Sequence, residues 1–204
     1  MFLCYYYFMI PQTFIFFGKS GCGKGTQAKL LIEYLSKKDP ENKIVYVETG
    51  ANLREFSQEI GLSAELTAKV MAEGGLLPSF IPIWIWTDQF VRKVAGHEHL
   101  VLDGLSRQPY EAPILDDALK FYKRQKPFVI VMNVSDDWAR ERLLGRARGD
   151  DNKIDIENRL DWFGKNVVPT IDYFRQSAYY TVLDINGEQA IPAVFEELKR
   201  KAGI

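Results

Sequence analysis

A three-layer α/β fold with a five-stranded parallel sheet is predicted by two features of the sequence. Short apolar runs bounded by turn residues alternate along the chain with longer segments of helical periodicity. Most of these runs are continuously apolar rather than alternating, which is typical of strands buried on both faces of a parallel sheet. Right-handed helical crossovers between such strands place helices on both faces of the sheet, so the helices form the two outer layers.

The predicted elements follow one another without an internal repeat, low-complexity run or flexible linker. The strands are residues 13–17, 44–48, 100–103, 127–134 and 181–185. The helices are residues 24–38, 53–60, 64–73, 81–94, 110–124, 136–146, 154–177 and 190–201. We therefore expect one domain over residues 1–204. Ligands of such folds bind beyond the carboxyl ends of the strands.

The composition excludes several classes of protein. The chain has 204 residues, 47% of them hydrophobic, and a formal net charge of -1, so we expect one apolar core and neither a nucleic-acid nor a membrane partner. The two cysteines, Cys4 and Cys22, form no CxxC pair, so we predict neither a disulfide framework nor a zinc site. His97 and His99 lie in a short polar stretch before a strand and are interpreted as loop residues.

The first ten residues are almost wholly apolar and aromatic. The segment is too short to span a bilayer, and it lacks the basic flank and cleavage site of a signal peptide. Either translation begins at Met9, so that residues 1–8 are not native, or the segment extends the first strand. A weak membrane contact is a third interpretation.

A glycine-rich loop at residues 18–26 follows the first strand and opens the first helix. Its glycines let the backbone wrap N–H groups around phosphate oxygens, and the helix N-terminus adds its positive dipole end. Lys24 would reach the outer phosphates of a nucleoside triphosphate. This strand–loop–helix context predicts the P-loop NTPase fold. The candidate ATP-binding residues of the loop are Gly21, Cys22, Gly23, Lys24, Gly25 and Thr26.

Three further motifs lie at the ends of the next elements. They are Thr-Gly-Ala-Asn-Leu-Arg at residues 49–54, Met-Ala-Glu-Gly-Gly-Leu-Leu at 71–77 and Asp-Gly-Leu-Ser-Arg at 103–107. Together with the loop and its Gly-Lys-Gly-Thr ending, they resemble the adenylate kinase family, whose pattern has Thr-Gly-x-x-Leu-Arg, a Gly-x-Leu turn and Asp-Gly-x-Pro-Arg. The resemblance implies reversible transfer of the ATP γ-phosphoryl group to AMP, giving two ADP, with Mg²⁺ accompanying ATP.

The resemblance also implies an acceptor site, with residues 49–78 as the inserted monophosphate-binding segment. Arg54 and Arg107 would hold the acceptor phosphate, because planar guanidinium groups suit bidentate phosphate contacts. Asp103 would hold the water shell of Mg²⁺. The residues implied to frame the base are Thr49, Gly75, Leu76, Leu77 and Gly104. Ser106 replaces the family's proline, a change that we expect to affect only loop rigidity.

Glu111 leaves the acceptor base open. Four residues after the motif's arginine the family carries a glutamine that reads adenine, and this chain has Glu111. An ionised Glu only accepts hydrogen bonds, which suits the two adjacent donors of guanine, whereas Thr49 resembles the adenylate-specific pattern. We expect AMP as the acceptor, with GMP or another nucleoside monophosphate as the alternative. Glu111 could also simply favour the first turn of the following helix.

A series of arginines follows the fourth strand. The residues that match the family's spacing are Arg142, Arg146, Arg148, Asp150, Asp151 and Arg159. The resemblance implies that Arg142 stacks on the ATP base and that Arg146 also binds ATP. It implies that Arg148 and Arg159 also contact the monophosphate. The candidate catalytic residues are Lys24, Arg107, Arg146, Arg148 and Arg159. Since the attacking phosphate oxygen is already a nucleophile, these cations are needed to offset charge repulsion rather than to remove a proton.

The lid of the family is nearly absent. Residues 146–150 form a vestigial lid in which only Ala147 separates two arginines. Since lid closure excludes water from reacting phosphates, we expect that the site is poorly shielded, with slow ATP hydrolysis in the absence of acceptor, or that a neighbouring subunit covers it. We expect a cytoplasmic enzyme, either a monomer or a small homo-oligomer.

Gln189, after the fifth strand, matches the position where the family contacts the ATP base through its backbone. Trp84 and Trp86 lie in an apolar stretch and are predicted to pack rather than to stack on a base. A P-loop kinase of a small non-nucleotide acceptor is an alternative, disfavoured by the two acceptor motifs. A non-catalytic nucleotide-binding protein is disfavoured by the intact Lys24 and arginines.

Overall fold

The computed structural model describes residues 10–146 and 153–204, and in these residues no helix is long and apolar enough to cross a membrane. The strands are β1 (Thr13–Gly18), β2 (Ile44–Glu48), β3 (His99–Asp103), β4 (Phe128–Asn133) and β5 (Thr181–Asn186). The helices are α1 (Lys24–Lys38), α2 (Thr49–Phe56), α3 (Leu62–Ala72), α4 (Phe80–Lys93), α5 (Ala112–Phe121), α6 (Asp136–Arg146), α7 (Lys153–Trp162), α8 (Val168–Arg175) and α9 (Ile191–Ala202). A 3₁₀ turn, η1 (Pro109–Glu111), and a π-helical turn, η2 (Phe163–Val167), complete them.

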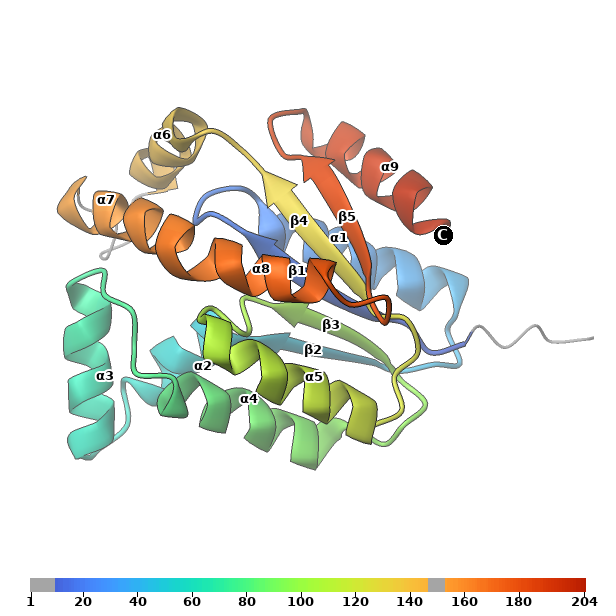
Figure 1. The fold of residues 1–204 in the computed structure, drawn as a ribbon, viewed down its shortest axis with the longest axis horizontal. Coiled ribbons are helices and arrows are strands. Elements are labelled where there is room, and N and C mark those ends of the chain that lie inside the picture. The colour runs from blue at the N-terminus through green and yellow to red at the C-terminus, as the bar shows by residue number, and fades with distance from the viewer. Residues whose placement is uncertain (1–9, 147–152) are drawn as a thin grey trace, which may run out of the picture.

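All five strands are parallel and lie in the order β2-β3-β1-β4-β5 (Figure 1). β1 is central, and its Phe14 pairs with Val101 of β3 on one side and with Phe128 of β4 on the other. The predicted fold class is confirmed. Because β1 is central, the loop that follows it emerges in the middle of the carboxyl edge of the sheet.

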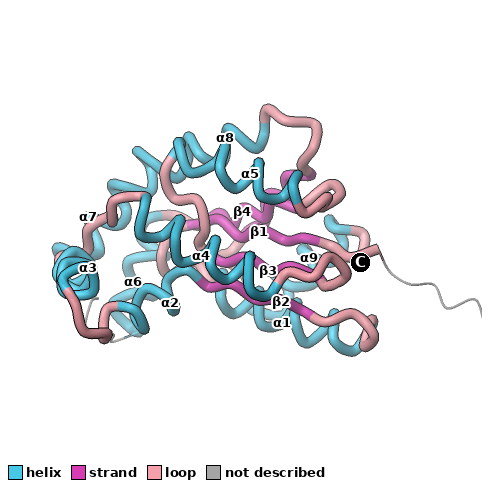
Figure 2. The backbone as a smooth tube through the Cα atoms, turned by 90° about the horizontal axis from the view of Figure 1, so that it is seen from below, coloured by secondary structure: helices cyan, strands magenta, loops and turns pink. Residues whose placement is uncertain are grey.

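The sheet is buried on both faces, as its continuous apolar runs predict. Phe14 and Phe16 of β1 pack with buried residues of α1 and α9 on one face. Ile15 and Phe17 point to the other face and pack with residues of α4, α5 and α8. Figure 2 shows the sheet between these two helical layers.

The tryptophans of α4 occupy different environments. Trp86 is fully buried and contacts Phe90 edge to face at 5.3 Å between ring centroids, so its predicted packing role is confirmed. Trp84 is half exposed and contacts Phe56 of α2 at 5.1 Å. Both rings therefore pack against other aromatic side chains.

The helix predicted at residues 154–177 is present over residues 153–175, with a π-helical turn inside it. The π-helical turn η2 separates α7 from α8, because Pro169 has no N–H to donate to the preceding turn. Two side chains also bond to carbonyls in and beside this turn, since Asn166 donates to the Trp162 carbonyl at 3.2 Å and Thr170 donates to the Asn166 carbonyl at 2.9 Å. A second difference is that α2 begins at Thr49, four residues earlier than expected.

His99 is not a loop residue, and that interpretation was wrong. It is the first residue of β3 and is fully buried. Its Nε2 lies 3.0 Å from Oδ2 of Asp39, and its Nδ1 accepts the Gln12 backbone N–H at 3.1 Å. The imidazole therefore joins β1 and the end of α1 at the amino edge of the sheet, opposite the phosphate loop.

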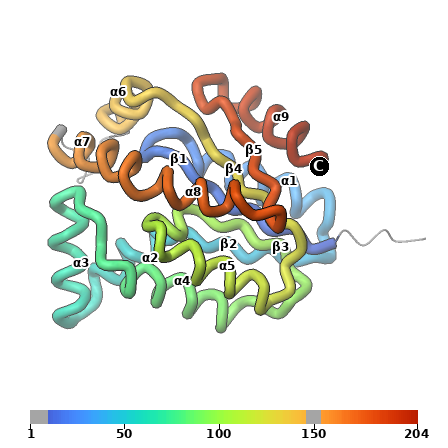
Figure 3. The backbone as a smooth tube through the Cα atoms, in the orientation of Figure 1, coloured from blue at the N-terminus to red at the C-terminus, as the bar shows by residue number. Residues whose placement is uncertain are grey.

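Helices α2 and α3 and the chain up to Pro78 extend beyond the sheet, and we call residues 49–78 the arm. Figure 3 shows α3 beyond the carboxyl edge of the sheet, next to α7. The two segments are in contact, because Asn158 of α7 donates to the carbonyl of Glu73, at the end of α3, at 3.4 Å. The arm therefore forms a side wall across from the phosphate loop.

Candidate active site

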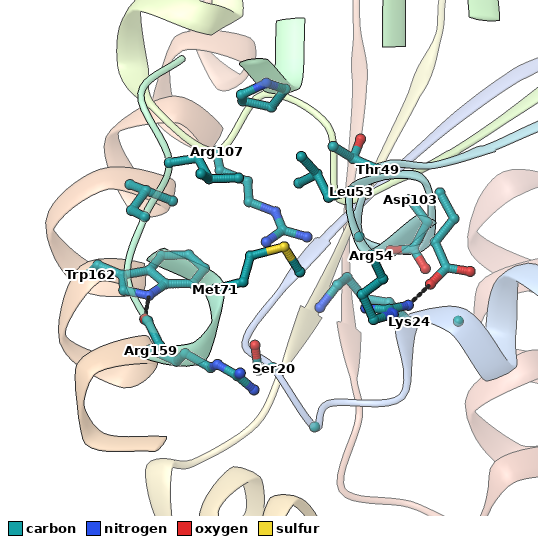
Figure 4. A pocket seen from close by; sticks show the side chains of 18 of the residues that line it. Ser20, Lys24, Thr49, Leu53, Arg54, Met71, Asp103, Arg107, Arg159 and Trp162 are labelled. Atoms are coloured by element: carbon teal, nitrogen blue, oxygen red, sulfur yellow. Dashed lines mark hydrogen bonds and ion pairs between the residues drawn. The ribbon is translucent and has the colours of Figure 1, made fainter. Parts of the chain in front are cut away.

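A cavity of about 520 Å³ lies at the carboxyl edge of the sheet. It is lined by the glycine-rich loop, the arm, the ends of β2 and β3, and α7. In Figure 4, Lys24, Arg54 and Asp103 lie on one side of the cavity, and Arg107, Arg159 and Trp162 reach it from the other. Residues from five separate motifs of the sequence are therefore brought to one space.

The glycine-rich loop has a conformation that requires glycine. Gly18 has φ 147° and Gly21 has φ 84°, and a Cβ on them would lie 2.7 and 2.8 Å from the carbonyl oxygens of Met132 and Ala139. The loop thus packs backbone to backbone against the segments around it. Cys22 is buried and its sulfur faces the core beside Gly18, so only its backbone is available to a phosphate.

Lys24 begins α1, and its amine lies inside the loop. Its Nζ donates to the carbonyls of Gly18 at 2.7 Å and Lys19 at 2.9 Å. Gly23 caps the helix with φ 94°. The lysine charge and the N-terminus of α1 therefore face the same part of the cavity, where both favour a phosphate.

Arg54 and Arg107 converge on the first turn of α2. A side chain on Gly50 would lie 3.4 Å from Nη1 of Arg54 and 3.5 Å from Nη2 of Arg107. Arg54 is held by Glu48 at 3.2 Å, and Arg107 donates from Nε to the Gly104 carbonyl at 2.9 Å. Desolvation lowers the pKa of Arg107, so an anionic ligand beside it would be favoured.

Four of the base-framing candidates lie together. Thr49, Gly75, Leu76 and Leu77 all line the cavity, whereas Gly104 lies beneath Arg107 and accepts its Nε–H. The Thr49 hydroxyl is buried and has no hydrogen-bond partner in the described part of the chain. Since a buried hydroxyl without a partner is unfavourable, this group is suited to bond a ligand.

Glu111 lies at the cavity, and both of its carboxylate oxygens are engaged within the protein. Oε1 accepts the Ser79 hydroxyl at 2.6 Å, and Oε2 accepts the Arg107 backbone N–H at 2.7 Å. Burial raises the pKa of Glu111, although these two donors and the Arg107 charge oppose the shift. The carboxylate joins the start of α4 to the loop that carries Arg107.

Ser106, in the same loop, has an unusual backbone conformation. It has φ 54°, in the left-handed region, and it is buried. A proline ring fixes φ near about −65°, so the family's proline could not occupy this backbone conformation. Serine therefore permits a conformation that proline would not, and the expected effect on loop rigidity stays a prediction.

Asp103 ends β3 beside the phosphate loop, and its Oδ2 would lie 3.5 Å from a Cβ on Gly25. Burial raises the pKa of Asp103, and the charges of Lys24 and Arg107 oppose that shift. Residues 10–146 and 153–204 contain no group of three or more potential metal ligands. Magnesium usually binds through one or two carboxylates together with phosphates, so Asp103 in this place fits Mg²⁺.

The arginines after β4 are described in part. Arg159 is buried and lines the cavity, and Arg142 also lines it, with its guanidinium 4.7 Å from the Trp138 ring centroid. The side chain of Arg146 lies outside the described residues, as do Arg148, Asp150, Asp151 and the rest of the vestigial lid.

Gln189 does not line the described cavity. Its amide donates to the Asn186 carbonyl at 2.9 Å and to Glu197 at 2.6 Å. The turn before it lies against the phosphate loop, because a Cβ on Gly187 would be 3.3 Å from the Cys22 carbonyl oxygen.

Trp162 is a cavity residue that the sequence reasoning missed. Its Nε1–H donates to the Gly74 carbonyl at 3.3 Å. The available signal was its spacing, because it follows Arg159 by three residues in α7 and so shares a helix face with it.

Together the parallel sheet, its strand order and the glycine-rich loop between β1 and α1 define a P-loop kinase. Comparison with known proteins gives the particular family. The family model described as adenylate kinase matches residues 16–179. The adenylate kinase of Nautilia profundicola is 34% identical over 204 residues, which cover 96% of this chain and all of that protein. Adenylate kinase 1 of Nostoc sp. is 31% identical over 192 residues, which cover 93% and 97% of the two chains.

The chain therefore belongs to the adenylate kinase family. It is a phosphotransferase with adenylate kinase activity, which converts ATP and AMP to two ADP.

Proposed function

We propose that this reaction takes place across the cavity, with the ATP phosphates in the loop at residues 18–26 and AMP between the arm and Arg107. The observation that carries the proposal is the convergence of Arg54 and Arg107 on Gly50, on the same cavity that Lys24 lines. Two guanidinium groups at one point suit the two charges of a monophosphate. The Thr49 hydroxyl and the backbone at residues 75–77 then frame the adenine.

Catalysis in this arrangement is positioning and charge stabilisation. The AMP phosphate is already a nucleophile, so no residue has to accept a proton. Lys24, Arg107 and Arg159 surround the path between the two phosphate sites, and we assign Arg146 and Arg148 to the same cluster from the family pattern. Mg²⁺ bound with ATP would neutralise charge on its phosphates, and Asp103 would hold its water shell.

The contacts of Glu111 support AMP rather than GMP as the acceptor. A carboxylate that reads guanine must direct its oxygens at the two donors of the base. Both oxygens of Glu111 already accept hydrogen bonds from Ser79 and Arg107. We therefore assign Glu111 a structural role, in which it joins Ser79 to the backbone of Arg107.

Steady-state rates with ATP and each of AMP, GMP, CMP and UMP test the acceptor. We expect AMP to be preferred over GMP by at least about tenfold in kcat/KM, which corresponds to about 1.4 kcal/mol in transition-state binding. Equal rates with GMP would contradict the role given to Glu111.

Lys24→Met tests the donor site. The amine of Lys24 bonds only to loop carbonyls and the Cys22 sulfur among the described contacts, so we expect transfer to be abolished with little change in thermal stability. Lys37→Met is the matched control, because Lys37 is an exposed lysine of the same helix. Full activity of Lys24→Met would refute the assignment.

A further inference from the structure

The turn that ends α3 approaches α7 so closely that no side chain fits between them. Gly74 is buried, has φ 65°, and a Cβ on it would lie 2.6 Å from Cβ and 2.7 Å from Cα of Asp155. Both atoms of Asp155 lie at the backbone and have no freedom to rotate away. Only glycine allows this contact between the arm and α7.

Two side chains of α7 bind the carbonyls at the end of α3. Asn158 donates to the Glu73 carbonyl at 3.4 Å, and Trp162 donates to the Gly74 carbonyl at 3.3 Å. Both carbonyls lie just beyond Ala72, the last residue of α3, so the two side chains bind the turn that follows that helix. Asn158 and Trp162 are four residues apart and share one face of α7. The arm is therefore held along a defined stripe of that helix.

Trp162 also contacts the acceptor site. The guanidinium carbon of Arg107 lies 6.0 Å from the centroid of its indole ring, and the ring lines the cavity. An aromatic face attracts a guanidinium and leaves the N–H groups at its edge free for a phosphate. One side chain thus contacts both the arm and Arg107, and Figure 4 shows the indole and the guanidinium on the same side of the cavity.

We propose that Trp162 is a positioning residue that latches the arm, through Gly74, against α7 and so shapes the acceptor site. The latch couples the position of the base-framing residues at 75–77 to that of Arg107. The latched arm also shields the acceptor side of the cavity from water, a role that the nearly absent lid does not fill. The proposal rests on the assignment of AMP to this cavity, and it makes the arm the element that excludes water from the acceptor phosphate.

Two kinds of variant test the latch. Trp162→Phe keeps an aromatic ring beside Arg107 and removes the N–H that Gly74 accepts. Gly74→Ala instead forces the arm away from Asp155. Its matched control is Gly203→Ala, because Gly203 has φ 69° at the end of α9 and nothing lies within 4 Å of its Cβ position. Alanine has the same backbone strain at both positions, but only the Cβ at position 74 would clash with a neighbouring residue.

We expect Trp162→Phe to raise the KM for AMP roughly two- to tenfold, as for the loss of one hydrogen bond, with the KM for ATP unchanged. Gly74→Ala should raise the KM for AMP further, and Gly203→Ala should leave it unchanged. Both latch variants should also hydrolyse ATP faster, relative to transfer, than the wild type. Tryptophan fluorescence adds a direct readout, because Trp162 lines the acceptor cavity and its contribution to the change on AMP binding should be lost in Trp162→Phe.

Equal increases in the KM for both substrates would overturn the proposal, because they would indicate a general loss of structure. An unchanged KM for AMP in Trp162→Phe, or equal effects of the two alanine variants, would also overturn it. Failure of the latch is distinct from failure of the proposed site, since it would leave the AMP preference of the wild type and the inactivity of Lys24→Met intact.

Discussion

Ser106 gives the sharpest test of the loop that carries Arg107. Its φ of 54° places a residue with a Cβ in the left-handed region, at a cost of about 1–2 kcal/mol. Its buried hydroxyl has no partner within the described residues, which costs about 1–3 kcal/mol more. Ser106→Gly removes both terms and adds the backbone entropy of glycine, about 0.5–1 kcal/mol. We therefore expect a gain of about 1–4 kcal/mol in the free energy of unfolding.

Ser106→Pro should have the opposite effect. The pyrrolidine ring would have to change φ by roughly 120°, from 54° to about −65°, so we expect a loss of more than about 1 kcal/mol. In a chain of this length each kcal/mol shifts Tm by about 2–4 °C, so calorimetry separates the two variants. The KM for AMP should rise in Ser106→Pro, because Arg107 is the next residue.

Lys123→Gly is the matched control for Ser106→Gly. Lys123 has nearly the same φ, 53°, and it is exposed, so its replacement reports the backbone effect without the buried hydroxyl. Urea unfolding of both glycine variants separates the two contributions. A proline variant as stable as the wild type would refute the backbone geometry on which this reasoning depends.

Two further predictions concern buried or bonded carboxylates. Glu111→Ala should lower the free energy of unfolding by about 1–3 kcal/mol, because it leaves the Arg107 backbone N–H without an acceptor; Glu111→Gln retains an acceptor and should lose less, and equal losses in urea unfolding would contradict this. Asp116 has a lowered pKa, since hydrogen bonds from Lys120 and Tyr180 outweigh the effect of burial. Its stabilisation is present above the unfolded pKa of 3.8 and is lost as the pH falls below it, so Asp116→Asn should flatten the acid limb of the stability profile, and an unchanged limb would refute the assignment.

The fold was predictable because its signals are local. Each strand is a short apolar run, and the glycines of residues 18–26 indicate the backbone geometry of their loop. The π-helical turn η2 was not predictable, because the apolar periodicity of residues 154–177 continues through it and only Pro169 hints at the change. Local patterns therefore placed the elements but missed the change of helix type within this one.

The candidate site was predictable only where a motif carried it. Arg54 and Arg107 lie in motifs and converge as expected, whereas the roles of Glu111, His99 and Trp162 depend on partners far away in the chain. Ser79 is 32 residues from Glu111, and Asp39 is 60 residues from His99. Sequence patterns cover residues that are near one another in the chain and do not reveal such distant pairs. The sequence therefore suggested that Glu111 reads the base, although Ser79 and Arg107 already bond to both of its carboxylate oxygens.

The central place of β1 has a consequence for how the enzyme responds to heat. The phosphate loop is anchored to the central strand, which has two strands on each side of it, so we expect this anchor to open only when much of the sheet unfolds. The arm is joined to the body through α2, α4 and the contact with α7, and such segments open in local fluctuations of lower free energy. Hydrogen exchange should therefore be slow in β1 and faster in the arm. On warming, AMP binding should be lost at a lower temperature than ATP binding.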